Sequence, residues 1–338
     1  MLKGALIGVG HVARNGHLPG WRGRSDATLI AAADARVEGR QAFLEAFPKA
    51  RWYGTAEELL AAEKPDFTDV CTPPALHAPI ARAALEAGCH VLCEKPLVLS
   101  PSQIPPLAAL ARDRGRALVT VHNWKHAPAL ARVTELLRAG AVGRVARVRW
   151  ETLRREPAVA AGQIGNWRVD PAQSGGGILV DHGWHAIYVL REWLGGAPRT
   201  VSGHLETRKH RDFPIEDTAS VSLEWNGAAA EVFLTWAAEE RRNRVEIEGE
   251  RGRLLLDGGR LELSARDAAS QTWNLPSIAE GSHHPDWFLG VVEELLREVK
   301  DPSARGRNLE EAALCATLLD LARESSARGG AKLPVPAP

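Results

Sequence analysis

The chain has 338 residues, of which 45% are hydrophobic and 25% are charged, the balance of a soluble globular protein long enough for two domains. Its 42 basic residues equal its 42 acidic residues, so the formal net charge is +0. This balance argues against a nucleic acid or a membrane surface held by bulk charge, and the apolar runs are shorter than the about 20 residues of a membrane span.

Up to residue 121 the chain alternates short apolar strands with amphipathic helices. The apolar N-terminus leads directly into glycine, histidine and arginine without a small-residue cleavage site, so we interpret it as a first β-strand. Alternation of this kind predicts a parallel sheet with helices on both faces. The expected strands are Ala5–Gly8, Thr28–Ala33, Phe67–Cys71, His90–Cys93 and Ala117–Val121, and the expected helices include Val37–Phe47, Leu76–Ala87 and Ile104–Arg114.

From residue 122 onward the pattern changes to strands in which apolar and polar residues alternate. Two short turns, Asn226-Gly227 and Asp257–Gly259, are typical of β-hairpins and predict an open, mostly antiparallel sheet. The tail after Arg328 is expected to fray. The expected strands are Val145–Thr152, Val201–Arg208, Ala219–Trp225, Ala230–Trp236, Val245–Glu248, Gly252–Leu256 and Arg260–Ser264, with helices at Pro128–Ala139, Gly175–Leu194, Asp286–Val299 and Asn308–Arg323.

These patterns predict two closely joined domains, because no internal repeat or low-complexity linker separates them. Residues 1–121 are expected to form an α/β domain with a doubly wound parallel sheet. Residues 122–338 are expected to form an α+β domain with an open, mostly antiparallel sheet, whose closing helices pack back toward the first domain.

A glycine-rich turn follows the first expected strand and opens a helix. Gly8, Gly10 and Ala13 fit the G-x-G-x-x-G/A pattern of Rossmann folds that bind dinucleotides. The first glycine permits the tight turn, the second lets the backbone approach a pyrophosphate, and the small third residue lets helix and strand pack closely. The phosphates would lie on the backbone amides around His11 and Val12, at the helix N-terminus.

An aspartate at the end of the second strand strengthens this prediction. Asp34 lies 24 residues after Gly10, where an acid accepts hydrogen bonds from the adenosine ribose hydroxyls. Its carboxylate would repel a 2′-phosphate, so NAD is favoured over NADP. Arg36 could reach a 2′-phosphate, but a solvated arginine at a helix start is the interpretation that we favour.

Two further segments follow apolar strands at the carboxyl edge of the predicted sheet, where open α/β sheets bind ligands. Thr72 and Pro73 close one strand, and His77 lies on the turn after them. Glu94 and Lys95 close the next strand. The proline that follows holds the lysine in extended geometry and could support a cis peptide bond. These residues are therefore candidates for binding the cofactor.

A second glycine run, Gly175–Gly177, precedes an aspartate and a histidine spaced four residues apart, Asp181 and His185. On a helix this spacing places both side chains on one face. A carboxylate that orients an imidazole and stabilises its charged form suits a general base that takes a hydroxyl proton. His182 would point away from His185 and is interpreted as structural.

Cysteine and histidine spacings give no sign of a metal site. No CxxC pair occurs, and we expect reduced thiols of a cytoplasmic protein. His283 and His284 are adjacent, but no carboxylate stands near them at ligand spacing, so no metal is expected. The four cysteines are Cys71, Cys89, Cys93 and Cys315.

Taken together, these motifs resemble the Gfo/Idh/MocA oxidoreductase family, which includes glucose–fructose oxidoreductase and inositol dehydrogenase. The resemblance extends from Met1 to about Arg323. It rests on the segments GVGHVA with Asp34, TPPALH, CEKP, the Asn-Trp-Arg run that begins at Asn166, and GGGILVDHGWHAI.

The resemblance implies a Rossmann domain and a C-terminal sheet whose outer face commonly forms dimers or tetramers. It also implies that Lys95 lies beside nicotinamide and substrate, that Asp181 and His185 are catalytic, and that Asn123 lies near the nicotinamide. One position departs from the family. Relatives often carry an aromatic residue and then arginine after the last parallel strand, whereas this chain has Trp124 and Lys125. Lysine does not replace a bidentate arginine, so substrates cannot be transferred from relatives here.

The expected chemistry is reversible oxidation of a secondary alcohol on a sugar, a cyclitol or a sugar derivative. His185 would take the hydroxyl proton while hydride passes to the nicotinamide, Asp181 would stabilise the imidazolium, and Lys95 would stabilise the developing alkoxide. Indole faces stack on the apolar faces of sugars. The expected substrate contacts are Lys95, Trp124, Lys125, Trp167, Arg168, Asp181 and His185, with Trp184 as a further candidate.

Two alternatives remain open from the sequence. The first is a glycoside hydrolase of the same family that uses NAD for transient oxidation and then eliminates the aglycone. The second is a sensor that binds NAD and a metabolite to control a partner, although such members usually lose the catalytic lysine or histidine. The expected partners are a small carbohydrate and a second copy of this chain, in a homodimer or homotetramer formed through the C-terminal sheet.

Overall fold

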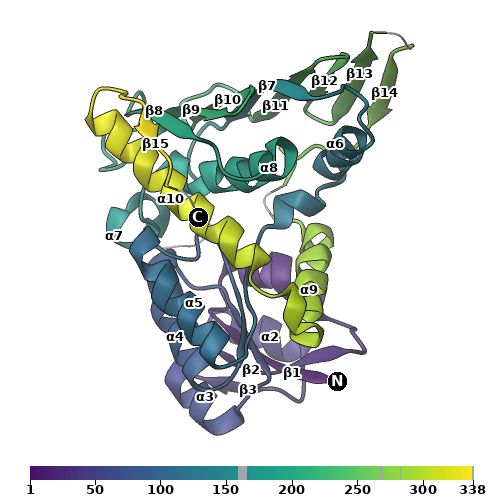
Figure 1. The fold of residues 1–338 in the computed structure, drawn as a ribbon. Helices are drawn as coiled ribbons and strands as arrows, with labels where there is room; N and C mark the ends of the chain where they lie inside the picture. Colours follow the sequence, from purple (N-terminus) through teal and green to yellow (C-terminus); the bar gives the residue numbers. More distant parts are fainter. Residues whose placement is uncertain (159–165, 267–268, 282, 337–338) are drawn as a thin grey trace. The chain divides into compact units, whose positions relative to one another are not determined.

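The computed structural model describes residues 1–158, 166–266, 269–281 and 283–336 (Figure 1). The chain forms two compact units. Unit 1 consists of Met1–Asn123 and His283–Ala313, and unit 2 consists of Trp124–Ser282 and Leu314–Pro338. The division lies close to the boundary expected from the sequence, but residues 283–313 belong to unit 1.

Unit 1 is built on a six-stranded sheet whose strand order is β3-β2-β1-β4-β5-β6, with every neighbouring pair parallel. This is the order of dinucleotide-binding Rossmann folds, in which the chain reverses direction beside the first strand. The predicted doubly wound α/β domain is confirmed. The strands are β1 Leu2–Ile7, β2 Ala27–Ala33, β3 Arg51–Tyr53, β4 Phe67–Val70, β5 His90–Cys93 and β6 Leu118–Thr120.

Helices cover this sheet, and one of them comes from the far end of the sequence. The helix α9 places Val291, Val292 and Leu295 in the same apolar core as Leu6 and Phe67. Burial of this face explains why 283–313 folds with the first unit. The helical segments of unit 1 are η1 Ala13–His17, α1 Leu18–Trp21, α2 Arg40–Ala46, α3 Ala56–Glu63, η2 Pro74–Leu76, α4 His77–Glu86, η3 Pro101–Gln103, α5 Ile104–Asp113, α9 Pro285–Lys300 and η7 Pro302–Ala304.

Unit 2 contains a nine-stranded sheet of order β14-β13-β12-β11-β7-β10-β9-β8-β15. All neighbouring pairs are antiparallel except β7 and β10, which are parallel, so the prediction of a mostly antiparallel sheet is confirmed. The strands are β7 Val145–Leu153, β8 Thr200–Glu206, β9 Thr218–Trp225, β10 Ala228–Thr235, β11 Arg242–Gly249, β12 Gly252–Asp257, β13 Arg260–Ala265, β14 Gln271–Asn274 and β15 Leu333–Pro334.

One face of this sheet is covered and the other is open. On β7 the buried side chains of Val148 and Trp150 alternate with the partly exposed Arg149 and Glu151, as expected for a strand with one solvated face. The helix α8 packs along the covered face (Figure 1). The helical segments of unit 2 are α6 Pro128–Arg138, η5 Trp167–Val169, α7 Pro171–Ser174, η6 Leu179–Gly183 and α8 Trp184–Leu194; η4 Asn123–His126 and α10 Arg307–Ala327 span the boundary between the units.

The chain end differs from the expectation. Residues 329–336 are ordered. Leu333 pairs with Val201 as strand β15 on β8, and the Val335 amide donates a hydrogen bond to the Arg199 carbonyl at 2.9 Å. The predicted fraying after Arg328 is therefore wrong for these residues, because a buried Leu333 anchors the segment. The short strands β3 and β14 were not expected from the sequence either.

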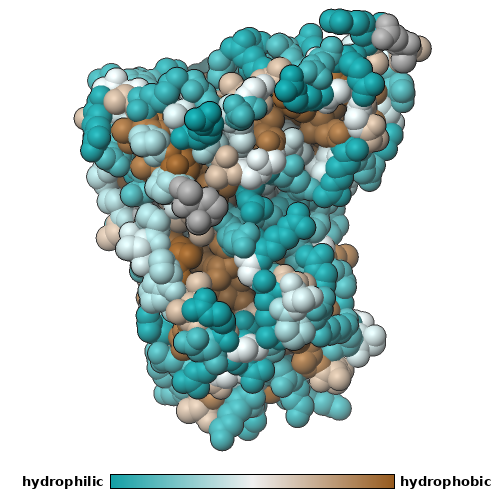
Figure 2. Space-filling model, in the orientation of Figure 1, coloured by the Kyte–Doolittle hydropathy of each residue, from teal (hydrophilic) through white to brown (hydrophobic). Residues whose placement is uncertain are grey.

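Polar side chains dominate the surface that Figure 2 displays, with brown apolar residues in separate groups. Among the described residues, no helix combines the length and apolar character needed to cross a membrane.

Candidate active site

The glycine-rich turn after β1 combines a tight packing contact with an open backbone. Gly8 has φ +86°, and a Cβ there would lie 2.8 Å from the backbone of Cys71 and Thr72. A Cβ at Gly10 would meet only the guanidinium of Arg36, at 3.9 Å. Gly8 therefore lets the turn pack on the end of β4, whereas Gly10 leaves backbone that a phosphate can approach.

Asp34 follows β2 and ties its end to this turn. One carboxylate oxygen accepts the Val9 N–H at 2.8 Å, and the other accepts the Arg36 N–H at 2.8 Å. Each carboxylate oxygen can accept a further hydrogen bond, so these contacts are compatible with ribose hydroxyls. The Arg36 side chain is 62% exposed, with Nε 3.8 Å from Asp34 Oδ1.

Two observations support a fit between this edge of the sheet and a dinucleotide. The buried Thr72 hydroxyl, at the carboxyl end of β4, has no hydrogen-bond partner in the part of the chain that the structure describes. His11, in the first turn after the glycines, is exposed, and His283 lies edge-on against it at 4.3 Å between ring centres. The open Gly10 backbone, the Thr72 hydroxyl and Asp34 together suit the pyrophosphate and ribose of NAD. His283 was not expected beside this turn.

His77 joins the two strand-end turns of unit 1. It is 1% exposed, and its Nδ1 and Nε2 lie 2.7 Å from the carbonyl oxygens of Pro96 and Thr72. Burial lowers the pKa of His77, and a neutral imidazole donates to one of these carbonyls at a time. The Lys95–Pro96 peptide bond is cis, as the sequence suggested. His77 thus holds the turn that carries Lys95, and its predicted contact with the cofactor stays a prediction.

In unit 2, the glycine run serves a different purpose from the first one. A Cβ at Gly177 would lie 1.8 Å from the carbonyl oxygen of Glu216, so only glycine fits. The Glu216 carboxylate accepts the N–H groups of Gly177 and Leu179, at 2.9 and 3.2 Å. It caps the start of the helix that carries His185, although burial raises the pKa of Glu216. The helix begins after the glycines, so the predicted start at Gly175 is wrong.

His185 is held by a tyrosine that the sequence analysis did not identify. The His185 Nδ1 lies 2.7 Å from the Tyr188 hydroxyl, which also accepts the Trp124 N–H at 3.0 Å. The Trp124 ring stacks on the imidazole at 4.4 Å with an interplanar angle of 9°. The signal was present in the sequence, because residues three apart on a helix are neighbours.

Asp181 lies in η6, a π-helical turn that precedes α8. Its Oδ2 is 3.3 Å from Nδ1 of His182. Its negative charge also acts on two arginines, Arg154 and Arg241. It partly offsets the burial that lowers the pKa of Arg154 to about 9 and that also lowers the pKa of Arg241. The sequence analysis missed both arginines. The predicted contact between Asp181 and His185 stays a prediction.

The other predicted substrate residues are distributed as follows. Lys125 lies near Tyr188, the partner of His185, with Nζ 5.6 Å from the centre of the Tyr188 ring. Arg168 stacks on its neighbour Trp167 at 4.4 Å, in η5. Trp184 is fully buried, so it is a core residue and its proposed sugar contact is wrong. Lys95 and Asn123 lie in unit 1, as the predicted cofactor contacts require.

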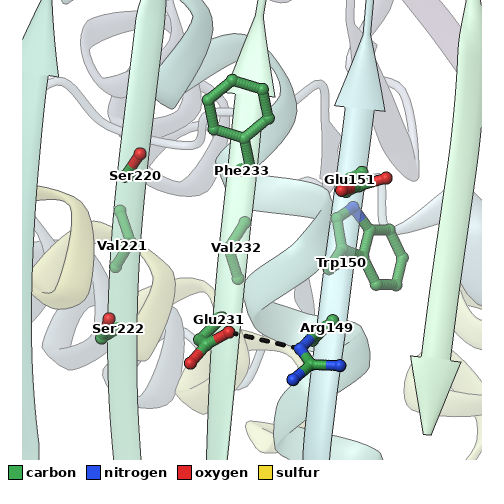
Figure 3. Close-up of a pocket in the computed structure, with 9 residues that line it drawn as sticks. All are labelled: Arg149, Trp150, Glu151, Ser220, Val221, Ser222, Glu231, Val232 and Phe233. Atoms are coloured by element: carbon green, nitrogen blue, oxygen red, sulfur yellow. Dashed lines mark ion pairs between the residues drawn. The ribbon is translucent and has the colours of Figure 1, made fainter.

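A hollow of about 300 Å³ lies on the open face of the unit 2 sheet (Figure 3). It is lined from β7, β9 and β10 and includes an Arg149–Glu231 ion pair at 3.6 Å. None of the predicted catalytic residues lines it. The hollow is therefore separate from the candidate active-site residues.

The structure also describes His284, the cysteines and one group of potential metal ligands. His284 stacks on Trp287 at 3.4 Å, an aromatic contact. All four cysteines are free thiols, as expected. Among the described residues, His17, Asp69 and Cys71 form a buried group with potential metal-ligand atoms within 4.8 Å of one another.

Comparison with known proteins agrees with this geometry. A family model described as an oxidoreductase family with an NAD-binding Rossmann fold matches residues 2–122, and one described as a GFO/IDH/MocA C-terminal domain matches residues 130–255. The D-apiose dehydrogenase of Paraburkholderia graminis is 30% identical over 95% of this chain and 88% of its own length. The D-glucoside 3-dehydrogenase of Escherichia coli is 34% identical over 60% of this chain and 57% of its own length.

Solved structures match the whole fold. GenD2 from gentamicin A biosynthesis, solved in complex with NAD, has a TM-score of 0.84 and 28% identity, covering 99% of this chain and 97% of that one. A levoglucosan dehydrogenase solved with NADH and levoglucosan has a TM-score of 0.82 at 21% identity, with coverage of 99% and 100%.

Proposed function

The chain belongs to the Gfo/Idh/MocA family of NAD-binding oxidoreductases, and from that premise we propose that it is a sugar or polyol dehydrogenase. It would interconvert a secondary alcohol and a ketone on a sugar, a cyclitol or a sugar derivative. The observation that carries the proposal is the position of His185 at the start of α8, with Nδ1 engaged by the Tyr188 hydroxyl. We infer that its Nε2 exchanges the proton with the substrate.

Three side chains have direct roles in the proposed reaction. Lys95 donates a hydrogen bond to the substrate oxygen and stabilises the negative charge that develops there. His185 accepts the hydroxyl proton, and the negative charge of Asp181 stabilises the resulting imidazolium. Bound NAD supplies the acceptor for the hydride that leaves the carbinol carbon. In the reverse direction His185 returns the proton and the ketone is reduced.

The substrate class rests on the relatives and on the groups near His185. The relatives are named for sugars and glycosides. We assign substrate contacts to Trp124 and Lys125, which gather around Tyr188, and to Trp167 and Arg168 in η5. A lysine ammonium is a compact donor that suits a hydroxyl, whereas a bidentate carboxylate contact favours arginine.

Asp34 supports NAD as the preferred cofactor over NADP. The carboxylate is fixed by two backbone N–H groups and would repel a 2′-phosphate. We assign cofactor contacts to the glycine-rich turn at Gly8, Gly10, His11, Val12 and Ala13, to Asp34 and Arg36, to Thr72, Pro73 and His77, and to Glu94, Lys95 and Asn123.

The open face of the unit 2 sheet is the proposed surface for a homodimer or homotetramer. Its hollow between β7, β9 and β10 mixes apolar and charged side chains, as subunit interfaces commonly do (Figure 3). Light scattering on the purified chain tests this. A substitution in the hollow, such as Phe233→Glu, should shift the mass toward that of one chain if the face is buried between subunits.

A substrate panel tests the proposed function. Sugars, cyclitols and sugar acids are incubated with NAD or NADP, and formation of the reduced cofactor is followed by absorbance. Turnover of one or more polyols with NAD supports the dehydrogenase. Release of the phenol from an aryl glycoside without net NADH identifies the hydrolase alternative instead, and tight binding of NAD with no turnover of any compound identifies the sensor.

A further inference from the structure

A buried histidine that the proposed mechanism does not use lies beneath the turn that carries Lys95. His17 ends η1, the π-helical turn that follows the glycine-rich turn. It is 2% exposed, and the Phe288 ring of α9 stacks on its imidazole at 4.0 Å. A polar ring in this position needs partners, because burial of an unpaired polar group is costly.

Both nitrogens of this ring face carboxylates. Nδ1 lies 2.9 Å from Asp69 Oδ2, and Nε2 lies 3.0 Å from Glu94 Oε1. The Trp21 indole N–H also donates to Asp69, at 2.7 Å. Ionised carboxylates only accept hydrogen bonds, and a neutral imidazole has only one N–H. The geometry is therefore that of an imidazolium that donates to Asp69 and Glu94 at once.

The charges around the ring agree with this assignment. Burial by itself lowers the pKa of His17, but the charge of Asp69 and the hydrogen bonds to Asp69 and Cys71 act in the opposite direction, and the pKa is raised well above 6.5. The pKa of Glu94 is lowered, because its hydrogen bond to His17 and the charge of His17 outweigh its burial. Cys71 Sγ lies 3.1 Å from Nδ1, and burial raises the pKa of this thiol to about 12, so it adds no charge at neutral pH.

The same atoms are too close together for a metal centre. Ligand atoms in a tetrahedral zinc site, with bonds of about 2.0–2.3 Å, lie roughly 3.3–3.7 Å apart. Here Nδ1 of His17 is 2.9 Å from Asp69 and 3.1 Å from Cys71. These are hydrogen-bond distances. The group therefore fits a proton better than a metal ion.

The Glu94 carboxylate links this group to Lys95. Its second oxygen, Oε2, accepts the Lys95 backbone N–H at 2.9 Å. On the other side of the turn, His77 contacts the Pro96 carbonyl. The turn is thus fixed both before and after Lys95, by two buried histidines.

We propose that His17 is a positioning residue: by bridging Asp69 and Glu94 it fixes the turn that presents Lys95 to the substrate oxygen. The inference rests on the proposed role of Lys95. Loss of the His17 proton removes one hydrogen bond to a buried carboxylate and leaves that carboxylate without its counter-charge. Turnover should therefore fall at alkaline pH through a group that neither substrate nor cofactor touches.

The test compares the wild type with His17→Gln and Glu94→Gln, and with His90→Gln as the control. His90 is a buried histidine of the same sheet whose Nδ1 accepts the Ala117 N–H. We expect kcat of the His17 and Glu94 variants to fall by about 10- to 100-fold, the usual effect of removing a group that orients a reactive ligand. The dissociation constant of NAD should stay within about threefold in His17→Gln, and the double variant should lose little more kcat than the worse single variant.

The pH profile separates positioning from a structural role. The midpoint of the alkaline limb of the kcat profile should differ from the wild-type value in His17→Gln and in Glu94→Gln. It should be unchanged in His90→Gln. In ¹⁵N-histidine NMR, the His17 resonances are those present in the wild type and absent from His17→Gln. At pH 7.5 they should have the shifts of a ring protonated on both nitrogens. If His17→Gln does not fold, Glu94→Gln carries the kinetic test. The His17 resonances are then assigned by comparing the spectra of the wild type and Trp21→Phe.

Each other result has a defined meaning. If His17→Gln and Glu94→Gln both keep the wild-type kcat and the wild-type pH profile, the inference is overturned. A stoichiometric metal ion in the purified wild type that is lost in His17→Gln also overturns it. Full activity of Lys95→Ala instead overturns the proposed function, whatever the His17 variants do. The two failures are distinguishable, because a loss of kcat in His17→Gln and Glu94→Gln supports the inference only if Lys95→Ala is inactive.

Discussion

Two helices of this protein begin in the same way and use their histidines differently. Each follows a glycine-rich turn, contains a π-helical turn, η1 or η6, and places a buried histidine at or just after it. π-helical turns of this kind recur at functional sites. In unit 1 the histidine is His17, which bridges two carboxylates, and in unit 2 it is His185, which meets a neutral hydroxyl.

The partners explain the difference in role. Two carboxylates favour the charged form of His17 and keep its proton in place. The Tyr188 hydroxyl is neutral and can donate or accept a hydrogen bond, so it does not attract an imidazolium in the way that a carboxylate does. A base must release and regain a proton in each turnover, which suits the role that we propose for His185. The proposed roles of the two histidines thus follow from their hydrogen-bond partners, which the residue type alone does not reveal.

The glycines differ in the same way. Gly10 leaves backbone open to a ligand, whereas Gly177 leaves room for the Glu216 carbonyl. We propose that Gly10 serves binding, whereas Gly177 serves packing. The sequence predicts that a ligand approaches the backbone at Gly10, and the structure shows that the Glu216 carbonyl approaches it at Gly177.

The largest expected effect comes from removing the proposed base, His185. His185→Ala should lower kcat by at least about 100-fold with NAD affinity retained, because acid–base groups contribute about 10²- to 10⁴-fold. Steady-state NADH formation and NAD titration measure both quantities. His204→Ala, on the exposed part of β8, is the control and should leave both unchanged. Wild-type turnover in His185→Ala would remove the distinction between the two histidines.

Glycine substitutions sharpen the comparison of the two turns. Gly177→Ala should lower the free energy of unfolding by about 1–3 kcal/mol or more, because its Cβ would overlap the Glu216 carbonyl. Gly10→Ala should leave unfolding nearly unchanged and weaken NAD binding by about tenfold, roughly the 1.4 kcal/mol of one lost contact. Thermal unfolding and NAD titration of both variants give the result. Equal effects of the two substitutions on NAD affinity would contradict this division of roles.

Tyr188→Phe tests the neutral partner directly. It removes the acceptor of the buried Trp124 N–H and the partner of His185 Nδ1, so we expect a loss of about 1–3 kcal/mol in stability and of about tenfold in kcat. Tyr53→Phe is the matched control, since the chain has 2 tyrosines and Tyr53 contacts Glu63 in unit 1. Wild-type kcat in Tyr188→Phe would show that Tyr188 does not hold the His185 ring in its working position.

The smallest effect concerns stability against pH. The pKa of His17 is higher in the folded than in the unfolded chain, where about 6.5 applies. Its stabilising contribution is therefore complete below about pH 6.5 and is lost as the pH rises through the folded-state value. The stability difference between wild type and His17→Gln, from denaturant unfolding, should shrink as the pH rises above about 6.5. A difference that grows over this range would have the wrong sign for a bridged imidazolium.

The fold could be predicted from the sequence because its signals are local. Strand–helix alternation, the Gly8–Ala13 fingerprint and the hairpin turns at Asn226 and Asp257 each act within a few residues. The strand β15 escaped prediction because its pairing with β8 depends on a distant partner. The membership of α9 in unit 1 is also set by contacts far apart in sequence.

The candidate site divides in the same way. The sequence identified Lys95, Asp181 and His185 through short motifs. It missed His17 and Glu216, because their partners lie on other elements, 52 and 77 residues away for His17 and 39 and 37 residues away for Glu216. Tyr188 was within reach of the helical spacing, but a tyrosine among apolar residues suggests core packing as readily as a catalytic partner.

The central proposal is that Lys95 and His185 act on the same substrate oxygen. A double-mutant cycle on kcat with Lys95→Ala, His185→Ala and both together tests it most directly. We predict that each single change costs at least about 100-fold and that the double variant is hardly slower than the worse single one, as for groups that work as a unit. Wild-type turnover in either single variant, or losses that multiply in full, would contradict the account.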